Sequence, residues 1–484
     1  MDPRRAVSPR WAAPLAWLAL ALGCEDAGST SSGPSSSSAG GGGAEAAGAG
    51  GFGAGGAQAG GASVGGAALG GAAAGGSGGD LGWPFDDTVP SPCPPTPLGE
   101  GGVDWAGWVN LQFPALLEGQ VGQASEAIYG QAYAAGVTAQ PGPSDGWESE
   151  IGVGPWGTLP EGDARCWSFV PAEFNTDVGN NDEYAASVEP AREGLFAYVH
   201  RVRPAGGAWR YGDLDGSDDG LGVSELGLLD VASTGDAPLV IATLNLRCRI
   251  DDWAARRPLV VRALARIQPD VVALQEDCLD PSGRGQGEEV AALLAAHTKR
   301  GYQVHRETTH VATSGSESFP EGIAVMSAHR LDDVVVLDLP HANFPRKAIG
   351  VDLVVRGRAL RFYATHFDYG SANQAVRAQS AQLILADAPV GVPTFVAGDL
   401  NAEPGESGPL ELADALVDLW AAANPSQPGL TMPASGPTRR IDFVFASAPA
   451  APPVLEPLGA RLLDEAEDGV LLSDHLGVAA AVAW

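Results

Sequence analysis

From residue 238 onward, apolar runs of strand length alternate with stretches that have helical periodicity. A segment with Val260, Leu264 and Ile267 on one helical face separates the apolar runs PLVIATLNLR and QPDVVALQE. Pro258 is expected in the first turn of that helix, where its missing N–H group costs no hydrogen bond. The order strand, helix, strand predicts an α/β fold for this half of the chain.

Further apolar runs follow with little helical sequence between them. They predict strands over residues 321–327, 332–339, 347–355, 358–367, 392–399, 440–447 and 477–484, with a long helix over 371–387. Strands this uniformly apolar are covered on both faces. We therefore expect residues 238–484 to form two packed β-sheets flanked by helices.

Residues 103–232 have a different pattern. Short alternating runs such as WVNLQF, EAIYGQAYAAGVT and GLFAYVHRVR are separated by Gly, Pro and Asn-Asp turns. Period-two alternation with frequent turns is typical of antiparallel sheets. We predict an all-β sandwich domain of immunoglobulin-like type here.

The segment from residue 25 to residue 102 is dominated by Gly, Ala and Ser up to about residue 80. Such a composition has too few large apolar side chains for a core, so a disordered tether is expected.

Residues 1–24 have the pattern of an export signal. Arg4, Arg5 and Arg10 precede an apolar run of 13 residues, which is too short to span a bilayer. The run ends in ALGC, which resembles a bacterial lipobox with Cys24 as the acylated residue; plain secretion is the alternative. These features predict an extracytoplasmic protein, either a lipoprotein of the bacterial cell envelope or a secreted protein, without a transmembrane helix.

The chain is acidic throughout, with a net charge of −31. Residues 1–233 hold 28 acidic and 8 basic residues (−20), and residues 234–484 hold 31 and 20 (−11). Few cations are available to displace counterions from a polyanion. An anionic substrate would therefore need local neutralisation by a metal ion or by a few arginines. We expect a monomer.

Cysteine usage fits an oxidising compartment. Besides Cys24 the chain has Cys93, Cys166, Cys248 and Cys278, an even number with no CxxC spacing, so a zinc site is not indicated. A bond between Cys93 and Cys166 is one option that spacing alone leaves open.

The stretch DLDGSDDG places Asp213, Asp215, Ser217 and Asp219 two residues apart, like the start of a calcium loop. Ser224 stands where such a loop needs a glutamate. A Ca²⁺ site at the three aspartates is therefore the alternative to a polar hairpin turn, which we favour.

Polar side chains recur where the predicted strands of residues 238–484 begin or end. They are Asn245, Glu276, His366, Asp399, Asn401, Asp442, Asp474 and His475. Each alone has an ordinary explanation, such as a capping Asn, a solvated Glu or a structural His. Their coincidence at six strand ends predicts one polar site at the rim of the sheets.

The segments TLNLR, LQE, THFD, GDLN, RIDFV and SDH, in this order, resemble the endonuclease/exonuclease/phosphatase superfamily, which includes type I deoxyribonucleases. The resemblance covers about residues 238–484 and implies a four-layer α/β sandwich. It also implies a metal-dependent phosphoesterase in which activated water attacks a phosphodiester. Mg²⁺ is the expected cofactor, with Mn²⁺ as an alternative.

The resemblance also implies roles for the residues at the strand ends. Glu276 would be a metal ligand. Asn245 would be a second, neutral ligand or would hold the attacking water, and Asp474 would bind the metal or its water shell. Asp399 would be the base that activates water, and Asn401 would orient Asp399.

The two histidines would bind the phosphate group. His475 would contact the phosphate oxygen that gains charge, with Asp442 fixing its tautomer. His366 would bind phosphate or protonate the leaving group, and Glu321 would orient His366.

One position departs from the pattern of the abasic-site enzymes, which have a carboxylate where Arg247 stands. This difference and the export signal argue against DNA repair. Arg247, with Arg346, Lys347, Arg439 and Arg440, could form a local cationic patch or a solvated rim.

Cys248 lies three residues after Asn245, and Cys278 lies two residues after Glu276. If the two strands are neighbours, these cysteines lie side by side, so we predict a disulfide bond between them.

The expected function is thus an exported, lipid-anchored phosphodiesterase, with nucleic acid as the first substrate candidate. A sphingomyelinase acting on a phospholipid headgroup would need an aromatic-rich membrane loop, and only Phe319 and Phe344 stand in the candidate loops. An inositol-phosphate phosphatase would face the cytoplasm. A non-catalytic surface lipoprotein, binding ligands through Trp147, Trp156 or Trp167, is the alternative from another class.

Overall fold

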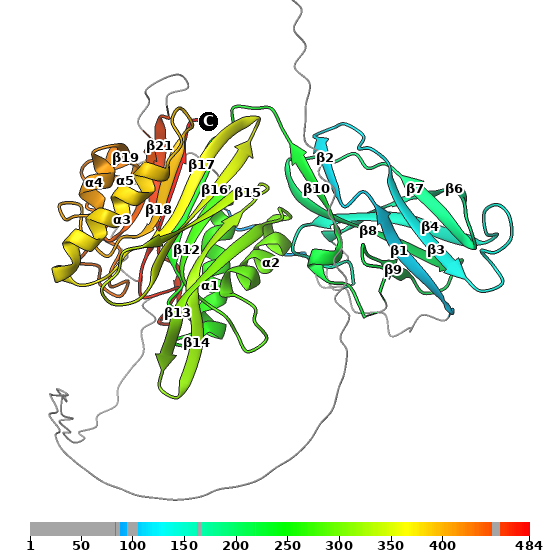
Figure 1. Cartoon of the computed structure of the whole chain (residues 1–484), viewed down its shortest axis with the longest axis horizontal. Helices are drawn as coiled ribbons and strands as arrows, with labels where there is room; N and C mark the ends of the chain where they lie inside the picture. Colours follow the sequence, from blue (N-terminus) through cyan, green and yellow to red (C-terminus); the bar gives the residue numbers. More distant parts are fainter. Residues whose placement is uncertain (1–82, 84–87, 94–104, 162–165, 218, 448–454) are drawn as a thin grey trace, which may run out of the picture. The chain divides into compact units, whose positions relative to one another are not determined.

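The computed structural model describes residues 83, 88–93, 105–161, 166–217, 219–447 and 455–484 (Figure 1). The predicted signal peptide over residues 1–24, its Cys24 and most of the tether over residues 25–102 lie outside the described residues. Within the described part of the chain, no helix is both long enough and apolar enough to cross a membrane.

The N-terminal part consists of β-strands in two sheets. One sheet has the order β1-β3-β7-β6, from Gly107–Phe113, Ile128–Ala134, Asn181–Ala186 and Glu173–Val178. The other has the order β2-β10-β8-β4-β5, from Leu116–Gln120, Gly227–Ala232, Gly194–Pro204, Trp147–Pro155 and Ser168–Pro171, and β9 (Arg210–Gly212) pairs with β8. The short 3-10 helix η2 (Val223–Glu225) precedes β10.

Buried side chains of both sheets form one core. Leu111 and Ile128 come from the first sheet, and Ile151, Tyr198 and Leu229 come from the second. Because side chains alternate across a strand, each sheet buries one face against the other.

The C-terminal part contains two six-stranded sheets. The first, with the order β13-β14-β12-β11-β24-β21, is built from Gln303–Ser314, Glu317–Ser327, Val271–Cys278, Leu239–Asn245, Gly477–Val482 and Pro457–Leu463. The second, with the order β15-β16-β17-β18-β20-β19, is built from Asp332–Leu339, Arg346–Val355, Arg358–His366, Thr394–Asp399, Asp442–Ser447 and Leu416–Asp418. β22 (Ala466–Glu467) and β23 (Val470–Leu471) form a small separate hairpin.

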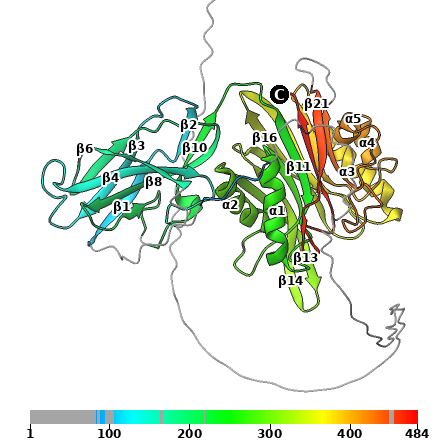
Figure 2. The same cartoon turned by 180° about the vertical axis from the view of Figure 1, so that it is seen from behind.

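Helices cover the outer faces of these two sheets. α1 (Trp253–Ile267) and α2 (Gln286–Thr298) pack on the first sheet, as Figure 2 shows from behind. α3 (Gln374–Asp387), preceded by η3 (Ser371–Asn373), and α4 (Pro409–Ala413) pack on the second, and α5 (Leu419–Ala423) buries Trp420 beside it. The result is the predicted α/β sandwich of two packed sheets flanked by helices.

The inner core between the two sheets is apolar, with Ile241 and Val325 from the first sheet facing Phe362 and Val444 of the second. Strands with apolar residues on both faces are buried on both sides, which explains why the sequence shows continuous apolar runs there.

The predicted strands and the long helix all occur, with end shifts of a few residues, but Pro258 was misplaced. α1 begins at Trp253, because the Asp252 carboxylate accepts a hydrogen bond from the backbone N–H of Ala255. Pro258 therefore lies beyond the first turn, inside the helix.

Candidate active site

Three neighbouring strands of the second sheet place three of the predicted side chains side by side. In the parallel pair β17–β18, His366 is the partner of Asp399, and in the antiparallel pair β18–β20, Asp399 is the partner of Asp442. The three residues are buried at the same edge of the sheet. The strand register therefore assembles half of the predicted site.

The first sheet contributes the other half. Asn245 ends β11, Glu276 lies near the end of its parallel neighbour β12, and Glu321 of β14 is the register partner of Cys278. The register of β12 shifts between Gln275 and Asp277, and Glu276 has a left-handed φ of 51°. Such a β-bulge re-aims a side chain, here toward the edge where the second sheet also ends.

Hydrogen bonds from one amide join the two halves. Asn245 Nδ2 donates to Glu276 Oε1 at 3.0 Å and to Asp399 Oδ2 at 3.3 Å. The same Asp399 oxygen lies 3.8 Å from Nδ1 of His475 and 3.5 Å from Nε2 of His366. Side chains spread over some 230 positions of the sequence thus meet in one buried cluster.

His475 is held by a carboxylate. Its Nδ1 donates to the two Asp442 oxygens at 3.0 and 3.2 Å. Burial disfavours the charged imidazole, but the carboxylates of Asp442, Asp399 and Asp474 outweigh burial and raise the pKa of His475 to about 10. The ring is therefore a cation whose orientation Asp442 fixes.

His366 has the opposite electrostatic environment. Nδ1 accepts a hydrogen bond from Arg346 at 2.9 Å, and Nε2 lies 3.1 Å from Nδ2 of Asn401. Burial and the charges of Arg346 and His475 hold the pKa of His366 well below its ordinary value. This ring is neutral, which favours the phosphate-binding alternative over the leaving-group acid.

Glu321 was predicted to orient His366, but the two side chains are not in direct contact. Its Oε1 lies 4.0 Å from Arg346 and 3.7 Å from Nε2 of His310, so Arg346 stands between it and His366. Burial and the neighbouring Glu276 raise the pKa of Glu321 to about 7.

Asp399 is buried beside the cationic ring of His475. Asn401 N donates to Asp399 Oδ1 at 2.8 Å, and Asn401 Nδ2 donates to the carbonyl oxygen of Phe367 at 3.1 Å. Burial raises the pKa of Asp399 to about 7; His475 lowers it, and Asp442 and Glu276 raise it. Within the described residues no lysine or arginine pairs with Asp399 or Glu276, so the cluster has the charge of a cation site.

Comparison with known proteins agrees with this geometry. The sequence of residues 242–475 matches the endonuclease/exonuclease/phosphatase family. This part of the chain belongs to that family. No protein of curated function is similar enough to the chain to match it.

Solved structures of the endonuclease/exonuclease/phosphatase fold are also similar. An endonuclease/exonuclease/phosphatase family protein from Leptotrichia buccalis is 18% identical over 51% of this chain and 100% of its own, with a TM-score of 0.44. One from Beutenbergia cavernae is 24% identical, over 51% and 71%, with a TM-score of 0.40. D. rerio TDP2 complexed with single strand DNA product is 20% identical, over 51% and 100%, with a TM-score of 0.41.

As a member of the endonuclease/exonuclease/phosphatase family, this part of the chain is a hydrolase of phosphate esters, for which divalent metal ions are the usual cofactors. Among the described residues, one group of three metal-type side chains has ligand atoms within 4.8 Å of one another, namely Asp399, Asp442 and His475. The Nδ1 atom of His475 carries the proton that it donates to Asp442, however, so it has no lone pair to offer a metal.

Asp474, predicted as a metal ligand, forms an ion pair with Arg247. Arg247 also pairs with Asp251 at 2.6 Å, and its backbone N–H donates to Oδ1 of Asn245 at 2.8 Å. Arg247 is thus tied to the cluster but neutralised by two carboxylates.

The predicted disulfide between Cys248 and Cys278 is present, with a Cα–Cα distance of 4.9 Å. It links the segments that follow Asn245 and Glu276, and the backbone N–H of Cys248 also donates to the Glu276 carbonyl at 2.9 Å. A second disulfide joins Cys93 and Cys166, the pairing that the sequence had left open.

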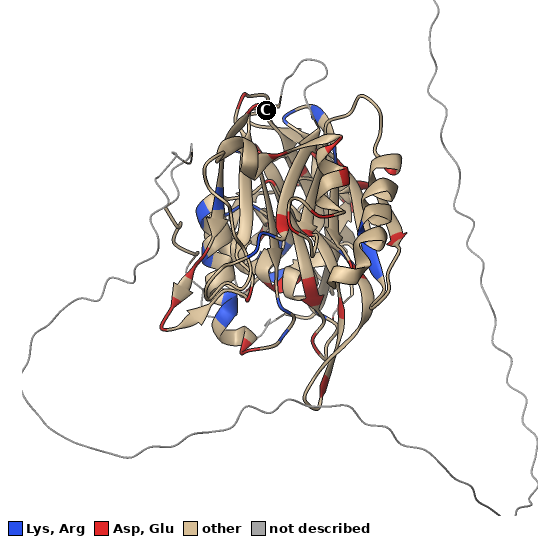
Figure 3. Ribbon diagram, turned by 90° about the vertical axis from the view of Figure 1, so that its left-hand side faces the viewer, with Lys and Arg blue, Asp and Glu red and all other residues tan. Residues whose placement is uncertain are grey.

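The other candidate basic residues do not form one patch. Lys347 pairs with Glu307, Arg439 with Glu403, and Arg440 with Asp418. On the side seen in Figure 3, Lys and Arg positions are interspersed with Asp and Glu positions. Of the residues proposed for local neutralisation, Arg346 is the one that contacts a site histidine.

The described residues of the DLDGSDDG stretch form a polar loop, but not the hairpin turn favoured from the sequence, because β9 before it and β10 after it both pair with β8 and not with each other. Asp213 Oδ1 accepts from the backbone N–H of Gly216 at 3.0 Å, and Asp215 Oδ1 accepts from that of Ser217 at 2.7 Å. These carboxylates with Asp219 are not among the close ligand groups found in the described residues. Asp213 and Asp215 cap backbone N–H groups, as turn aspartates do, and Asp219 accepts from the Ser217 hydroxyl.

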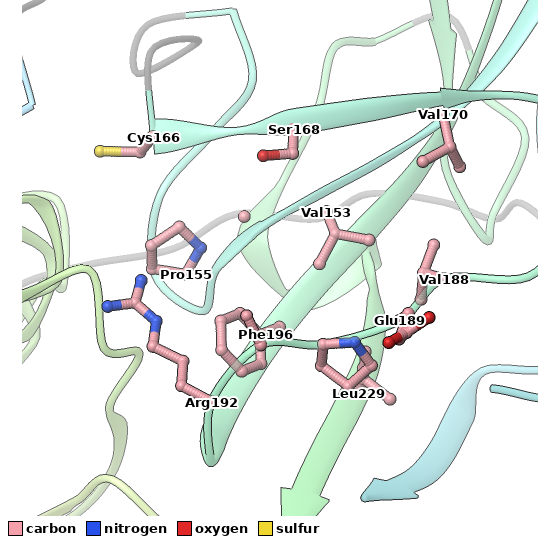
Figure 4. Close-up of a pocket in the computed structure, with 13 residues that line it drawn as sticks. Val153, Pro155, Cys166, Ser168, Val170, Val188, Glu189, Arg192, Phe196 and Leu229 are labelled. Atoms are coloured by element: carbon pink, nitrogen blue, oxygen red, sulfur yellow. The ribbon is translucent and has the colours of Figure 1, made fainter. Parts of the chain in front are cut away.

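The N-terminal sheets carry a hollow of about 380 Å³ (Figure 4). Apolar Val153, Val170 and Phe196 line it together with Glu189 and Arg192. Two of the tryptophans considered as ligand contacts serve packing: Trp167 is buried and donates a hydrogen bond to Thr158, and Trp147 packs edge-on against Trp105. The third, Trp156, lines a separate hollow.

Sequence reasoning missed two residues of the site. Arg346 was considered only as part of a cationic patch, and His310 was not considered. Both stand on strands whose pairing with neighbours brings them to the site edge, and no local pattern reports that pairing.

Proposed function

We propose that the chain is an exported, lipid-anchored and divalent-cation-dependent phosphodiesterase of nuclease type. The observation that carries this proposal is the meeting of Glu276, Asn245, Asp399, His366 and His475 at one edge of two packed sheets. A decayed enzyme would have lost at least one of these side chains, so the site argues against a non-catalytic lipoprotein.

Glu276 and Asn245, with Asp474, would hold the cation. Carboxylate and amide oxygens suit Mg²⁺ or Mn²⁺, and the repulsion between Glu276 and its neighbours Asp399 and Glu321, which raises the pKa of both neighbours, supports a cation at this place. Such a cation shields the charge of the phosphate and lowers the pKa of bound water. Because Asp474 is engaged with Arg247, Glu276 is the leading ligand.

The side chains of the second sheet would carry the proton and the charge. Asp399 has a pKa of about 7, near the working pH that a general base requires, and Asn401 fixes its carboxylate. His475, as a cation oriented by Asp442, would stabilise the phosphate oxygen that gains charge. Neutral His366, with Arg346 behind it, would bind a second oxygen.

Nucleic acid is the substrate we favour over a membrane phospholipid. The long hairpin of β13 and β14 turns at polar residues, with Ser314 and Glu317 as its last pair. One of its large apolar side chains, Val311, is strongly exposed, at 59%. A hairpin for membrane insertion would carry several exposed aromatic residues.

We also propose the division of the chain into a signal peptide with lipobox (1–24), a tether (25–102), a β-sandwich domain (103–232) and a catalytic domain (238–484). The strand order β1-β3-β7-β6 against β10-β8-β4 supports an immunoglobulin-like sandwich, whose sheets are ordered ABED and GFC. Two disulfides support an oxidising, extracytoplasmic location. The hollow in the N-terminal sheets supports a ligand-binding role for that domain.

A substrate panel tests the proposal. The full chain would be assayed on DNA, RNA, sphingomyelin and inositol phosphates, with Mg²⁺ or with a chelator, beside its Asp399→Asn variant. We expect cleavage of nucleic acid that requires the cation and Asp399. Activity that survives both chelation and the substitution would refute the mechanism.

A further inference from the structure

Two aromatic side chains are exposed next to the candidate active site. Phe344 is 43% exposed and Tyr369 is 44% exposed, and their ring centroids lie 6.1 Å apart. The ring of His310 stacks under Phe344, with centroids 4.3 Å apart and an interplanar angle of 10°. We call His310, Phe344 and Tyr369 the aromatic shelf.

The shelf is connected to the phosphate-binding side chains by short contacts. His310 lies 3.7 Å from Glu321, which lies 4.0 Å from Arg346, and Arg346 donates to His366. Along the chain, Phe344 is two residues before Arg346, and Tyr369 is three residues after His366.

The shelf is held in place by one buried carboxylate. Asp368 accepts hydrogen bonds from the backbone N–H groups of Ala342 (2.6 Å) and Asn343 (3.2 Å) and from Nδ2 of Asn343 (3.1 Å). Arg377, which is buried, donates to the carbonyl oxygen of Gly370 at 2.7 Å. Both loops that present the exposed rings are therefore ordered before any ligand binds, which lowers the entropic cost of binding.

We propose that the aromatic shelf stacks a base of single-stranded nucleic acid whose neighbouring phosphate occupies the site. This inference rests on the proposed function, because it names the substrate class of the same site. Stacking suits an acidic chain of net charge −31, which has few cations for counterion release.

The geometry favours a flat ring over other ligands. The nearly parallel His310 and Phe344 rings continue as a stack, whereas a quaternary ammonium headgroup is bound by a cage of rings around the cation. In a duplex the base faces are already covered by their neighbours, so an unpaired strand is the form that the shelf can bind.

The test compares two oligomers of equal length with the full chain: a single-stranded oligodeoxynucleotide and the corresponding abasic strand. Binding is measured by fluorescence anisotropy in a chelator, and hydrolysis is measured with Mg²⁺. Phe344→Ala should weaken binding of the base-containing strand by roughly 5- to 150-fold and raise its KM by a similar factor, and Tyr369→Ala should do so less. Neither variant should change binding of the abasic strand. Phe344→Trp, which keeps an aromatic ring, should bind the base-containing strand as the wild type does.

Phe113→Ala is the matched control. Phe113 is 45% exposed and stacks on Tyr129 at 4.5 Å, but it belongs to the N-terminal sheets, so its removal should leave both oligomers unaffected.

If Phe344→Ala weakened the binding of both oligomers equally, or of neither, the proposal that the aromatic shelf stacks a base would be contradicted. With sphingomyelin vesicles as a third ligand, weaker binding of Phe344→Ala to the vesicles alone would also contradict it. If the wild type cleaves neither oligomer but Phe344→Ala still weakens binding of the base-containing strand alone, the shelf stands and the proposed function fails.

Discussion

Two carboxylates, at opposite ends of the C-terminal sandwich, are equally buried and differ in what surrounds them. Asp270, just before β12, and Asp399, the last residue of β18, are each 1% exposed. Asp270 is bound by Arg300 at 2.5 Å, His329 at 2.9 Å, Arg356 at 3.3 Å and the backbone N–H of Val240 at 2.8 Å. Burial opposes its charge, but these partners hold the pKa of Asp270 far below its ordinary value.

Asp399 has no such set of fixed cations, and burial raises its pKa to about 7. A carboxylate satisfied by the fold stabilises the fold. A carboxylate that the fold leaves undercompensated is available to a cation, a water molecule or a proton. Burial alone therefore does not separate a structural acid from a functional one; the partners do.

The largest expected effect is on activity. Asp399→Asn should lower kcat about 1,000-fold, because the amide cannot take a proton from water. Steady-state hydrolysis of an oligonucleotide at saturating Mg²⁺ measures the change. Asp338→Asn, an exposed aspartate of the same sheet, should retain wild-type kcat. A variant at residue 399 with more than a tenth of wild-type kcat would contradict the role of the base.

Asp270→Asn should produce the opposite result. It leaves Arg300 buried without its carboxylate and removes one of the two carboxylates that pair with Arg356, so the free energy of unfolding should fall by about 3–5 kcal/mol. Urea denaturation measures this loss, and kcat per folded molecule should stay unchanged. A large loss of kcat with normal stability would break the distinction between the two aspartates.

The site end of the sandwich carries the disulfide between Cys248 and Cys278. Its removal should lower the free energy of unfolding somewhat less than Asp270→Asn does. Replacing both Cys248 and Cys278 by Ser opens a loop with a sequence separation of 30, which should lower the free energy of unfolding by about 3–4 kcal/mol. Because the bond links the segments after Asn245 and Glu276, the Mg²⁺ concentration for half-maximal activity should rise.

The control for that experiment is the Cys93, Cys166 pair. Its sequence separation of 73 implies a stability loss of about 4–5 kcal/mol on replacement by Ser. The Mg²⁺ requirement should not change. An equal change in both variants would show that the first disulfide does not act on the site.

The smallest effect is the pH dependence of stability without metal. Asp399 has a folded pKa of about 7, above the unfolded value, so the folded state binds more protons between about pH 4 and pH 7. Its contribution to stability is present below this range and is lost as the pH rises through it. Between pH 5 and pH 6, the wild type should lose about 1.4 kcal/mol per pH unit relative to Asp399→Asn, measured by denaturation in a chelator. Parallel pH profiles would contradict the raised pKa.

Much of this site could be predicted from the sequence, because parallel strands bring their carboxyl ends to one edge of a sheet. Asn245, Glu276, His366 and Asp399 each follow an apolar run and were predicted together. The sandwich of two sheets followed from the same runs.

What the sequence could not show depends on register and on long-range partners. Arg346 reaches His366 because β16 pairs with β17, and His310 reaches Glu321 because they are register partners across β13 and β14. The bulge that turns Glu276 toward the site has no local sequence signal. Asp270 and Asp399 both flank apolar runs, and only the arginines brought to Asp270 by the fold distinguish them.

The central claim is that the cluster around Asp399 is completed by a divalent cation. The most direct measurement is calorimetric titration of the metal-free full chain with Mg²⁺, beside the Glu276→Gln variant and, as a control, Glu317→Gln on the same sheet. The account predicts one site in the wild type and in Glu317→Gln, with proton release as Asp399 loses its proton, and binding at least tenfold weaker in Glu276→Gln. Equal binding in all three proteins, or no binding in any, would contradict it.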